Sequence, residues 1–354
     1  MKRRVRVAID AMGHDLGPEV VARGAAAAAR EMGDRVEVIL AGDESAIWQA
    51  LESEQPGPLP LFVVHAPQTV DMGEKAKEAF RTKPDSSIAV CARLVRNGRA
   101  DALVSMGNTG AVVATSLLSL GRMRGIRRPA IASTIPTAEG ACVVLDVGAN
   151  AENKPLHLYQ FALMGRLYAQ LVLEIPKPRV GLLNIGEEPS KGNALSQAAH
   201  HLLAQRREQL DFIGNVEGRD IFEGKADVVV CDGFTGNVIL KMAESIVSVG
   251  GRMVRQEIRR NWVATFGALL MTPAFHGLKS SLNYEEYGGA LLLGTRGVCV
   301  IGHGRSSPLA IRNAIKAAAR AVNSHLEDAI HQVVEADEQA GGAVVELSPA
   351  HVGR

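Results

Sequence analysis

Residues 99–120, RADALVSMGNTGAVVATSLLSL, contain the pattern that decides the fold expected for this chain. The apolar run from Ala102 to Val104 predicts a short buried strand, and an apolar helix is expected to follow from Ala111. Between them lies the polar glycine loop Ser105–Gly110. A strand, a glycine turn and a helix in this order point backbone N–H groups and a helix N-terminus at an anion.

The same layout occurs a second time at residues 225–240, KADVVVCDGFTGNVIL. Both copies have an Ala-Asp entry, an apolar run and a Gly-x-Thr-Gly turn, which starts at Gly107 in the first and at Gly233 in the second. Each turn alone is explained equally well as an ordinary strand–helix connection, because glycine serves backbone geometry there. Their repetition predicts two lobes that face one anionic ligand across a shared cleft.

The composition limits the class of protein. The chain has 354 residues, of which 47% are hydrophobic and 4% aromatic, and this length suits two domains or one large α/β unit. The formal net charge of +1 gives no reason to expect a nucleic-acid partner. The four cysteines are scattered without a CxxC pair, which indicates reduced thiols rather than a disulfide or zinc framework. We find no signal peptide or membrane-spanning run, and expect a soluble cytoplasmic protein.

Short apolar strands alternate with helices along most of the chain, which predicts a mostly parallel, three-layer α/β/α sheet. We expect one two-lobed domain over residues 1–335, with a strand hairpin at 130–145 and a single final helix at 309–335. Residues 240–285 break the alternation and predict a helical hairpin that projects from the sheet. Residues 336–354 are expected to form a loose tail.

The candidates for a binding site are the residues that follow each predicted strand, because ligands bind beyond the carboxyl ends of strands in open α/β sheets. These segments are rich in hydrogen-bond donors and glycine and include one lysine, but they contain no nucleophile motif and no cluster of metal ligands. We therefore expect positioning and charge stabilisation of an anion. The candidates are Asp10, His65, Gly107, Asn108, Thr109, Gly110, Asp146, Asn150, Lys191, Asn193, Asp232, Gly236, Asn237, His303 and Ser306.

Several candidates also have a simpler explanation. Asp146 and Asp232 are carboxylates of the kind that stabilises turns and helix starts. Lys191 stands at a predicted helix entry, where a cation opposes the helix dipole. A bound phosphate would compensate that charge, and the alternative is a solvated lysine.

Two groups of arginines form local basic patches and indicate an acidic partner, although solvated charge is the usual explanation. They are Arg122, Arg124, Arg127 and Arg128 in one group, and Arg252, Arg255 and Arg259, spaced i, i+3 and i+7 on one helix face, in the other. The uncharged apolar run at residues 262–275 predicts a subunit interface, with a membrane surface as the alternative.

Several motifs in the same order resemble the PlsX family. They include DAMGHDLGP at 10–18, LDVGAN at 145–150, NIGEEPSKGN at 184–193, DGFTGNVILK at 232–241 and HGRSSP at 303–308. The resemblance covers nearly the whole chain. It implies a Rossmann-like fold similar to those of phosphotransacetylases and isocitrate-type dehydrogenases, with a protruding helical hairpin. It also implies a homodimer that contacts the cytoplasmic membrane peripherally.

Members of this family are phosphate acyltransferases. The resemblance implies transfer of a long-chain fatty acyl group from acyl carrier protein to inorganic phosphate, without a cofactor or metal. The acyl phosphate serves phospholipid synthesis, so a glycerol-3-phosphate acyltransferase is an expected downstream partner. The two arginine groups are expected to dock the acidic carrier protein. The residues expected to act in catalysis are Lys191, Asn193, Asp232, Asn237 and His303, and the other candidates are expected to bind phosphate or substrate.

The expected mechanism is direct attack of a phosphate oxygen on the thioester carbonyl. The amide of Asn193 or Asn237 is expected to stabilise the oxyanion that develops. The thiolate that leaves has a pKa of roughly 8.5, so His303 can assist as an acid but is not required. The alternatives are an acyltransferase that uses acyl-CoA, an NAD-dependent dehydrogenase on a related fold, and a non-enzymatic scaffold for carrier protein. The dehydrogenase is disfavoured because no G-x-G-x-x-G motif is present.

Overall fold

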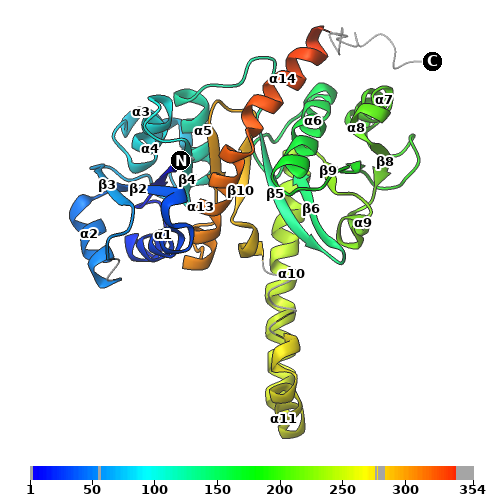
Figure 1. The fold of residues 1–354 in the computed structure, drawn as a ribbon. Coiled ribbons are helices and arrows are strands. Elements are labelled where there is room, and N and C mark those ends of the chain that lie inside the picture. The colour runs from blue at the N-terminus through cyan, green and yellow to red at the C-terminus, as the bar shows by residue number, and fades with distance from the viewer. Residues whose placement is uncertain (1–2, 55–56, 276, 278–283, 340–354) are drawn as a thin grey trace.

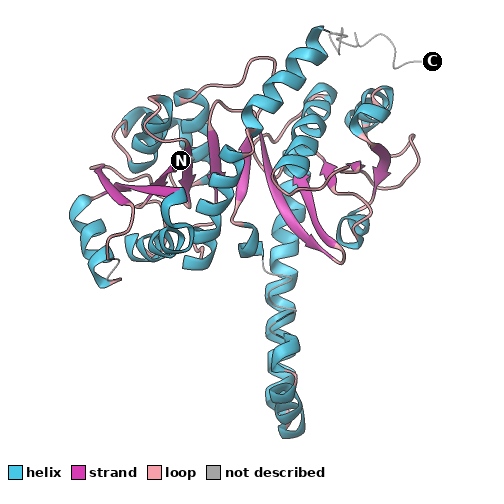
Figure 2. Ribbon diagram, in the orientation of Figure 1, coloured by secondary structure: helices cyan, strands magenta, loops and turns pink. Residues whose placement is uncertain are grey.

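A continuous sheet with helices on both faces forms the body of the computed structural model (Figures 1 and 2). The structure describes residues 3–54, 57–275, 277 and 284–339. In these residues, the strands are β1 (Val5–Asp10), β2 (Val36–Gly42), β3 (Leu61–His65), β4 (Ala102–Ser105), β5 (Ala130–Thr137), β6 (Gly140–Leu145), β7 (Val180–Leu183), β8 (Phe212–Val216), β9 (Val228–Val230), β10 (Ala290–Leu293) and β11 (Val298–Ile301). Their order in the sheet is β3-β2-β1-β4-β11-β10-β5-β6-β9-β7-β8.

The helices cover the sheet as two separate layers, which confirms the three-layer α/β/α fold. Successive residues of a strand point to opposite faces: Val7 and Ile9 lie in one core and Ala8 in the other. The first core is covered by α1 (Pro18–Met32), α2 (Glu44–Ser53), α6 (Pro155–Leu171), α7 (Ala194–Gln205), α8 (Arg207–Leu210), α13 (Pro308–Asn323) and α14 (Leu326–Gln339). The second is covered by α3 (Ala76–Thr82), α4 (Ser87–Arg96), α5 (Thr109–Ser119), α9 (Gly218–Glu223) and the start of α10 (Gly233–Arg260).

The direction of the strands changes in the middle of the sheet. β1, β4 and β11 are parallel to one another, whereas β10 is antiparallel to both β11 and β5, and β5 is antiparallel to β6. β9, β7 and β8 then continue in the direction of β6. The strands of the second half therefore run against β1, β4 and β11. Segments that follow β4 and β9 consequently leave the sheet at opposite edges.

A long helical arm projects from the body, as the sequence predicts (Figure 1). α10 has 28 residues and begins at Gly233, earlier than expected. Asn261 ends it in an extended conformation and caps α11 (Trp262–Leu270) by accepting a hydrogen bond from the Val263 N–H (2.8 Å). α11 packs back against α10. Part of the expected return of the hairpin, residues 276 and 278–283, lies outside the described residues.

Two features at the C-terminal end differ from the prediction. Strand β10 was not expected, and it pairs with both β11 and β5. The final helix is two helices, α13 and α14, because the chain breaks at His325, which has a φ of 52°. α14 also continues to Gln339, past the expected boundary, where the Tyr159 hydroxyl donates to Asp337 (2.8 Å). The rest of the expected tail, residues 340–354, lies outside the described residues.

Gly24 marks the closest packing of α1 against α13, and this contact gives a test of the fold. An added Cβ would lie 2.6 Å from Ile311 Cβ and 2.9 Å from the Pro308 carbonyl oxygen. Overpacking of this kind costs about 1–3 kcal/mol, which exceeds the ~1 kcal/mol that alanine gains over glycine in helix propensity. We therefore expect Gly24→Ala to lower the free energy of unfolding measured in urea.

Gly251→Ala is the matched control, because a Cβ added at this glycine of α10 meets no atom within 4 Å. It should leave stability unchanged or raise it. A Gly24→Ala variant more stable than the parent protein would contradict the packing described here.

Candidate functional site

The first-edge set consists of the candidate residues that follow β1, β3, β4 and β11. At its centre, buried hydrogen bonds join the ends of β1 and β4. Ser105 Oγ donates to Asp10 Oδ2 (2.7 Å), and the Gly13 N–H donates to Asp10 Oδ1 (3.0 Å). A Cβ on Gly13 would lie 3.0 Å from Gly107 Cα. Close backbone packing therefore explains why glycine occupies positions 13 and 107. The hydrogen bonds within the loops explain why an aspartate ends β1.

Asn108 of the first glycine loop is held mainly by structural hydrogen bonds. Its Oδ1 accepts from the Ala111 N–H (3.0 Å), which caps α5. Its Nδ2 donates to the carbonyl oxygens of Met72 (2.7 Å) and Glu74 (3.0 Å). Thr109 and Gly110 are exposed in the first turn of α5.

The histidines of the first edge differ in burial. His303 is exposed, and its backbone N–H donates to Ser306 Oγ (3.1 Å). His14 is buried and bridges the loops after β1 and β11, because its Nε2 lies 2.8 Å from the Ser306 carbonyl oxygen. His65 is exposed at the end of β3, two strands away from Asp10.

The second-edge set consists of the candidates that follow β6, β9 and β7, and Asp146 lies at its centre. This carboxylate is fully buried and accepts five N–H hydrogen bonds. The donors include the backbone of Ile131 (3.0 Å) and both the backbone (2.7 Å) and the side chain (2.9 Å) of Asn150. Burial raises the pKa of Asp146, and the N–H donors oppose that rise. Asp146 and Asn150 thus shape the turn after β6.

The start of α10 packs directly on this turn. Asp232 caps the helix by accepting from the N–H (2.9 Å) and the hydroxyl (2.7 Å) of Thr235. A Cβ on Gly233 would lie 2.6 Å from Asp146 Oδ2, and one on Gly236 would collide with the Asp146 carbonyl oxygen. These contacts require glycine at both positions. Asn237 is exposed beside the same turn, where its Cγ would lie 3.6 Å from a Cβ added at Gly148.

Lys191 and Asn193 lie in the loop between β7 and α7. Lys191 is exposed, and its ammonium makes no ion pair within the part of the chain that the structure describes. Asn193 caps α7 through Oδ1, which accepts from the Ser196 N–H (2.9 Å). Its carboxamide is otherwise exposed.

The structure does not bring the two sets together in one chain. β4 and β9 are separated by four strands and run in opposite directions. At about 4.8 Å between neighbouring strands, their ends lie roughly 24 Å apart across the sheet alone. No hydrogen bond among the described residues joins the loop at Asn108 to the loop at Asn237. The expectation of one cleft shared by both glycine loops is therefore wrong for a single chain.

The two Gly-x-Thr-Gly motifs also start at different positions relative to the N-cap of the helix that follows. Asn108 and Asp232 hold equivalent positions, because each caps its helix through a side-chain oxygen. Gly107 precedes its cap, whereas Gly233 follows its own. The sequence repeat thus corresponds to two different local structures.

Sequence reasoning missed a group of polar residues at the start of α6. His157 is 9% exposed, and its Nδ1 accepts from the backbone N–H of Lys154 (3.1 Å). Burial and the nearby cations Arg128, Lys154 and Arg127 lower the pKa of His157 to about 4. The imidazole is therefore neutral. His157 lies in the stretch NKPLHL at residues 153–158, but its position beside Arg127 and Arg128 depends on tertiary contacts.

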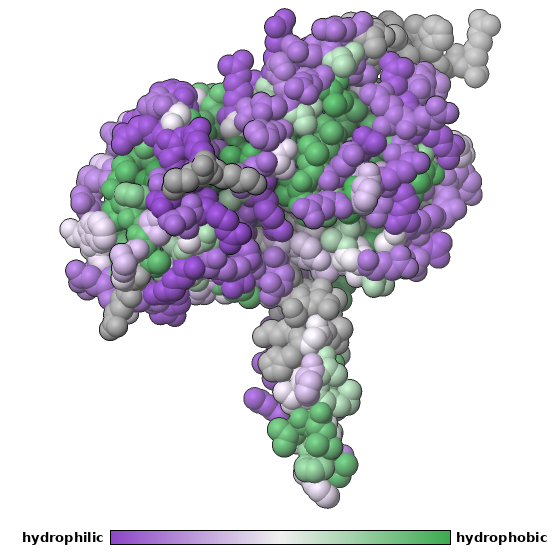
Figure 3. Space-filling model, viewed as in Figure 1, coloured by the Kyte–Doolittle hydropathy of each residue, from purple (hydrophilic) through white to green (hydrophobic). Residues whose placement is uncertain are grey.

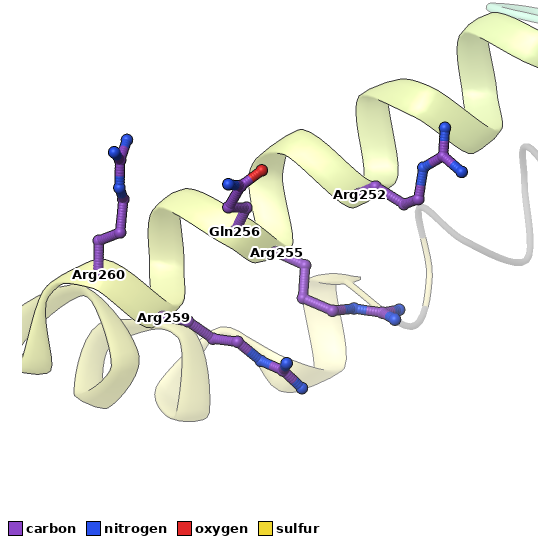
Figure 4. A pocket seen from close by; sticks show the side chains of 5 residues that line it. All are labelled: Arg252, Arg255, Gln256, Arg259 and Arg260. Carbon is purple, nitrogen blue, oxygen red and sulfur yellow. The ribbon is translucent and has the colours of Figure 1, made fainter.

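The arginines of the arm share one hollow, as their spacing predicts. Arg252, Arg255 and Arg259 extend from one side of α10, and Gln256 and Arg260 border the same hollow (Figure 4). Next to them, the apolar tip of the arm is exposed (Figure 3). Trp262 is 82% exposed and Leu269 70%. Among the described helices, none is long and apolar enough to cross a bilayer.

The cysteines do not provide a nucleophile. All four are buried, and burial raises the pKa of each thiol, that of Cys299 to about 12. Cys231 lies closest to the second-edge set, where its Sγ contacts the Asp146 carbonyl oxygen (3.5 Å). A protonated thiol is a poor nucleophile.

Comparison with solved structures agrees with the architecture. The EutD phosphotransacetylase from Staphylococcus aureus is 17% identical and superposes with a TM-score of 0.60, over 90% of this chain and 94% of that protein. A branched-chain phosphotransacylase from Enterococcus faecalis, also 17% identical, gives a TM-score of 0.59 over 90% and 99% of the two chains. At this identity the likeness shows a shared fold.

Sequence comparison identifies the family. The profile described as "Fatty acid synthesis protein" matches residues 5–328. The phosphate acyltransferase of Desulforudis audaxviator is 49% identical over 91% of this chain and 94% of its own length. That of Pelotomaculum thermopropionicum is 45% identical over 97% and 99%. The chain belongs to the PlsX family, the family of these phosphate acyltransferases.

Proposed function

We propose that this chain transfers a long-chain fatty acyl group from the thioester of acyl carrier protein to inorganic phosphate. One observation carries the proposal from the structure. The neighbouring strands β6, β9 and β7 direct the N-termini of α6, α10 and α7 to one edge of the sheet, beside Lys191 and Asn237. Helix N-termini and an unpaired cation suit a phosphate, and the family membership agrees.

The reaction needs only positioning and charge stabilisation. A phosphate oxygen attacks the thioester carbonyl, a C–O bond forms, the C–S bond breaks, and the carrier leaves as its thiol after gaining a proton. In this proposal Lys191 neutralises the phosphate, and the exposed amides of Asn237 and Asn193 stabilise the oxyanion. Asp146, Asn150 and Asp232 hold the turns in place.

The first-edge set is proposed to contact the substrate that is bound to a second copy of the chain. In the proposed homodimer, the first edge of one copy can face the second edge of the other. The exposed residues Thr109, Gly110, His65 and His303 would reach the same substrate in that way. Ser306 is buried and would position His303 through its backbone.

Acyl carrier protein is the proposed donor because it is acidic and this chain carries two basic patches that form no ion pair with the residues the structure describes. Arg122 and Arg124 are exposed on the segment before β5, and Arg252, Arg255 and Arg259 line the arm. Docking on these patches is expected to weaken as salt increases. The alternative donor is acyl-CoA, and a carrier-binding scaffold without activity is the alternative function.

The arm is proposed to serve both dimerisation and contact with the cytoplasmic membrane, where a glycerol-3-phosphate acyltransferase would take up the acyl phosphate. An apolar stripe runs along α10 at spacings of three and four residues and is at least 42% exposed throughout. It consists of Val238, Met242, Ile246, Val249 and Met253. Such a stripe suits a second helix from another copy, and the apolar tip beside arginines suits an anionic lipid surface.

The function is tested by following release of carrier thiol with a thiol reagent. We expect release from long-chain acyl carrier protein to depend on phosphate and to proceed faster than release from acyl-CoA. We expect Lys191→Ala to raise the phosphate KM or lower kcat at least tenfold, because it removes the cation that faces the nucleophile.

Lys177→Ala, which removes an exposed lysine from the turn before β7, is the control and should retain activity. An acyl-enzyme isolated without phosphate would exclude direct displacement. Absence of phosphate-dependent thiol release would favour the scaffold.

The two roles of the arm are separated by charged substitutions. We expect Leu269→Glu with Leu270→Glu to abolish flotation with vesicles of anionic phospholipid but to leave a dimer, because both residues lie on the exposed tip. We expect Ile246→Glu to weaken the dimer, measured by sedimentation, because it places a carboxylate within the apolar stripe. Ser248→Glu, on another face of α10, is its control. Flotation unaffected by the tip substitutions would exclude the membrane role.

A further inference from the structure

The arginine-rich segment before β5, residues 122–128, is held by two side chains, one from α6 and one from the turn after β6. Gln160, 7% exposed, accepts from the Arg127 N–H (2.8 Å) and donates from Nε2 to the Gly125 carbonyl oxygen (2.8 Å). Asn150 Nδ2 donates to the Pro129 carbonyl oxygen (2.7 Å) and to Asp146. The backbone on both sides of Arg127 and Arg128 is thus tied to α6 and to the turn after β6.

His157 presents a polar atom that the described residues leave without a partner. Its Nδ1 accepts the Lys154 N–H, so the ring proton lies on Nε2. Nε2 forms no hydrogen bond with a described residue, and it remains within reach of solvent although most of the side chain is buried. Nε2–H is therefore a hydrogen-bond donor held in place by the ring, and a ligand can reach it.

The cations around this donor are not neutralised. Arg127, Arg128 and Lys154 are exposed, and none makes an ion pair with a carboxylate of residues 3–54, 57–275 or 284–339. The buried carboxylate nearby, Asp146, is already satisfied by five N–H groups. Cations beside the N-terminus of a helix as long as α6 oppose its dipole. An anion bound here would interact favourably with all three cations and with the helix N-terminus.

We propose that Arg127, Arg128, Lys154 and His157 form a binding site for a phosphate group at the start of α6. Two guanidinium groups and one ammonium supply charge, and His157 Nε2–H supplies a neutral donor of fixed direction. The site lies on the same edge as Lys191 and Asn237, one strand from the start of α10. These residues therefore hold substrate, whereas Arg122 and Arg124 remain for docking the carrier surface.

The identity of the phosphate rests on the proposed function. A phosphate group reaches this edge either as inorganic phosphate, the nucleophile, or as the phosphodiester that links pantetheine to the carrier. Both present oxyanions to the same donors, so binding and kinetic measurements are needed to tell them apart.

Binding is measured first because it does not depend on activity. Inorganic phosphate and pantetheine 4′-phosphate are titrated by calorimetry into the full chain and into Arg128→Gln, Lys154→Gln and His157→Phe. We expect each substitution to weaken the preferred ligand about tenfold or more. His157→Gln retains an N–H donor and should recover part of the affinity. Arg96→Gln, which removes an exposed arginine from the last turn of α4, should bind as the parent does.

The imidazole of His157 gives an independent spectroscopic signal. Its pKa is lowered to about 4 by burial and by the three cations. A bound anion favours the protonated imidazole, so saturating ligand should move the pKa of His157 upward in an NMR titration. A purely structural histidine would show no such change.

Kinetics then assign the source of the phosphate. If the site takes inorganic phosphate, Arg128→Gln raises the KM for phosphate and leaves the KM for acyl carrier protein unchanged. If it takes the phosphodiester, the KM for acyl carrier protein rises, whereas acyl-pantetheine, which lacks the phosphodiester, is used equally well by parent and variant. Either result supports the proposal.

Unchanged affinity in all three variants, with no shift of the His157 pKa, would overturn it. Binding of phosphate with the expected losses, but without any thiol release, would instead refute the proposed function while preserving the site.

Discussion

The antiparallel pairing of β10 with β11 and β5, followed by that of β5 with β6, is the constraint on which the rest of the structure depends. These pairings reverse the strand direction between the two halves of one sheet. Because polar loops follow the carboxyl ends of strands, the reversal decides which loops can share a ligand. It separates Asp10 and His303 from Lys191 and Asn237 within a chain. It also places the arginine-rich segment, which enters β5, at the edge where β6 and β9 end.

Asp146 organises that second edge by an electrostatic balance. Removing a carboxylate from water is costly, and burial accordingly raises its pKa, yet five N–H groups surround it. Those donors come from the turn after β6 and from Ile131 in β5, and Asn150 extends the network to Pro129 and Gly233. One buried charge thus fixes the relative positions of α10, the turn and the arginine-rich segment. A rigid frame of this kind is what a site without covalent chemistry requires.

The sequence predicts local structure here far better than it predicts proximity. Val7 and Ile9 alternate in polarity with their neighbours, and Pro18 suits the first turn of a helix, so β1 and α1 follow from short-range rules. The helical arm follows from a long break in the strand pattern. By contrast, the order and direction of β10 and β5 depend on hydrogen bonds between segments more than 150 residues apart. The hydrogen bond between the Gln160 side chain and the Arg127 N–H likewise joins residues whose spacing in the sequence does not predict a contact. The sequences of the two glycine loops are alike because both precede a helix. The helix N-cap nevertheless falls within the first motif, at Asn108, and before the second, at Asp232.

Local charge can direct function in a protein whose net charge is only +1. At physiological ionic strength, the potential of an exposed charge decays over about 8 Å, so patches further apart act separately. Arg252 lies 19 residues beyond the start of α10 at Gly233, which is roughly 28 Å along the helix. In the proposed site, the cations at the start of α6 would therefore act on a ligand without contribution from the arginines of the arm. The arginines of the arm border the exposed apolar tip instead. His157 adds a donor that stays neutral at physiological pH, because burial and the same cations that attract an anion disfavour its protonation. The proposed site thus combines one neutral hydrogen-bond donor with the charge of two arginines and one lysine.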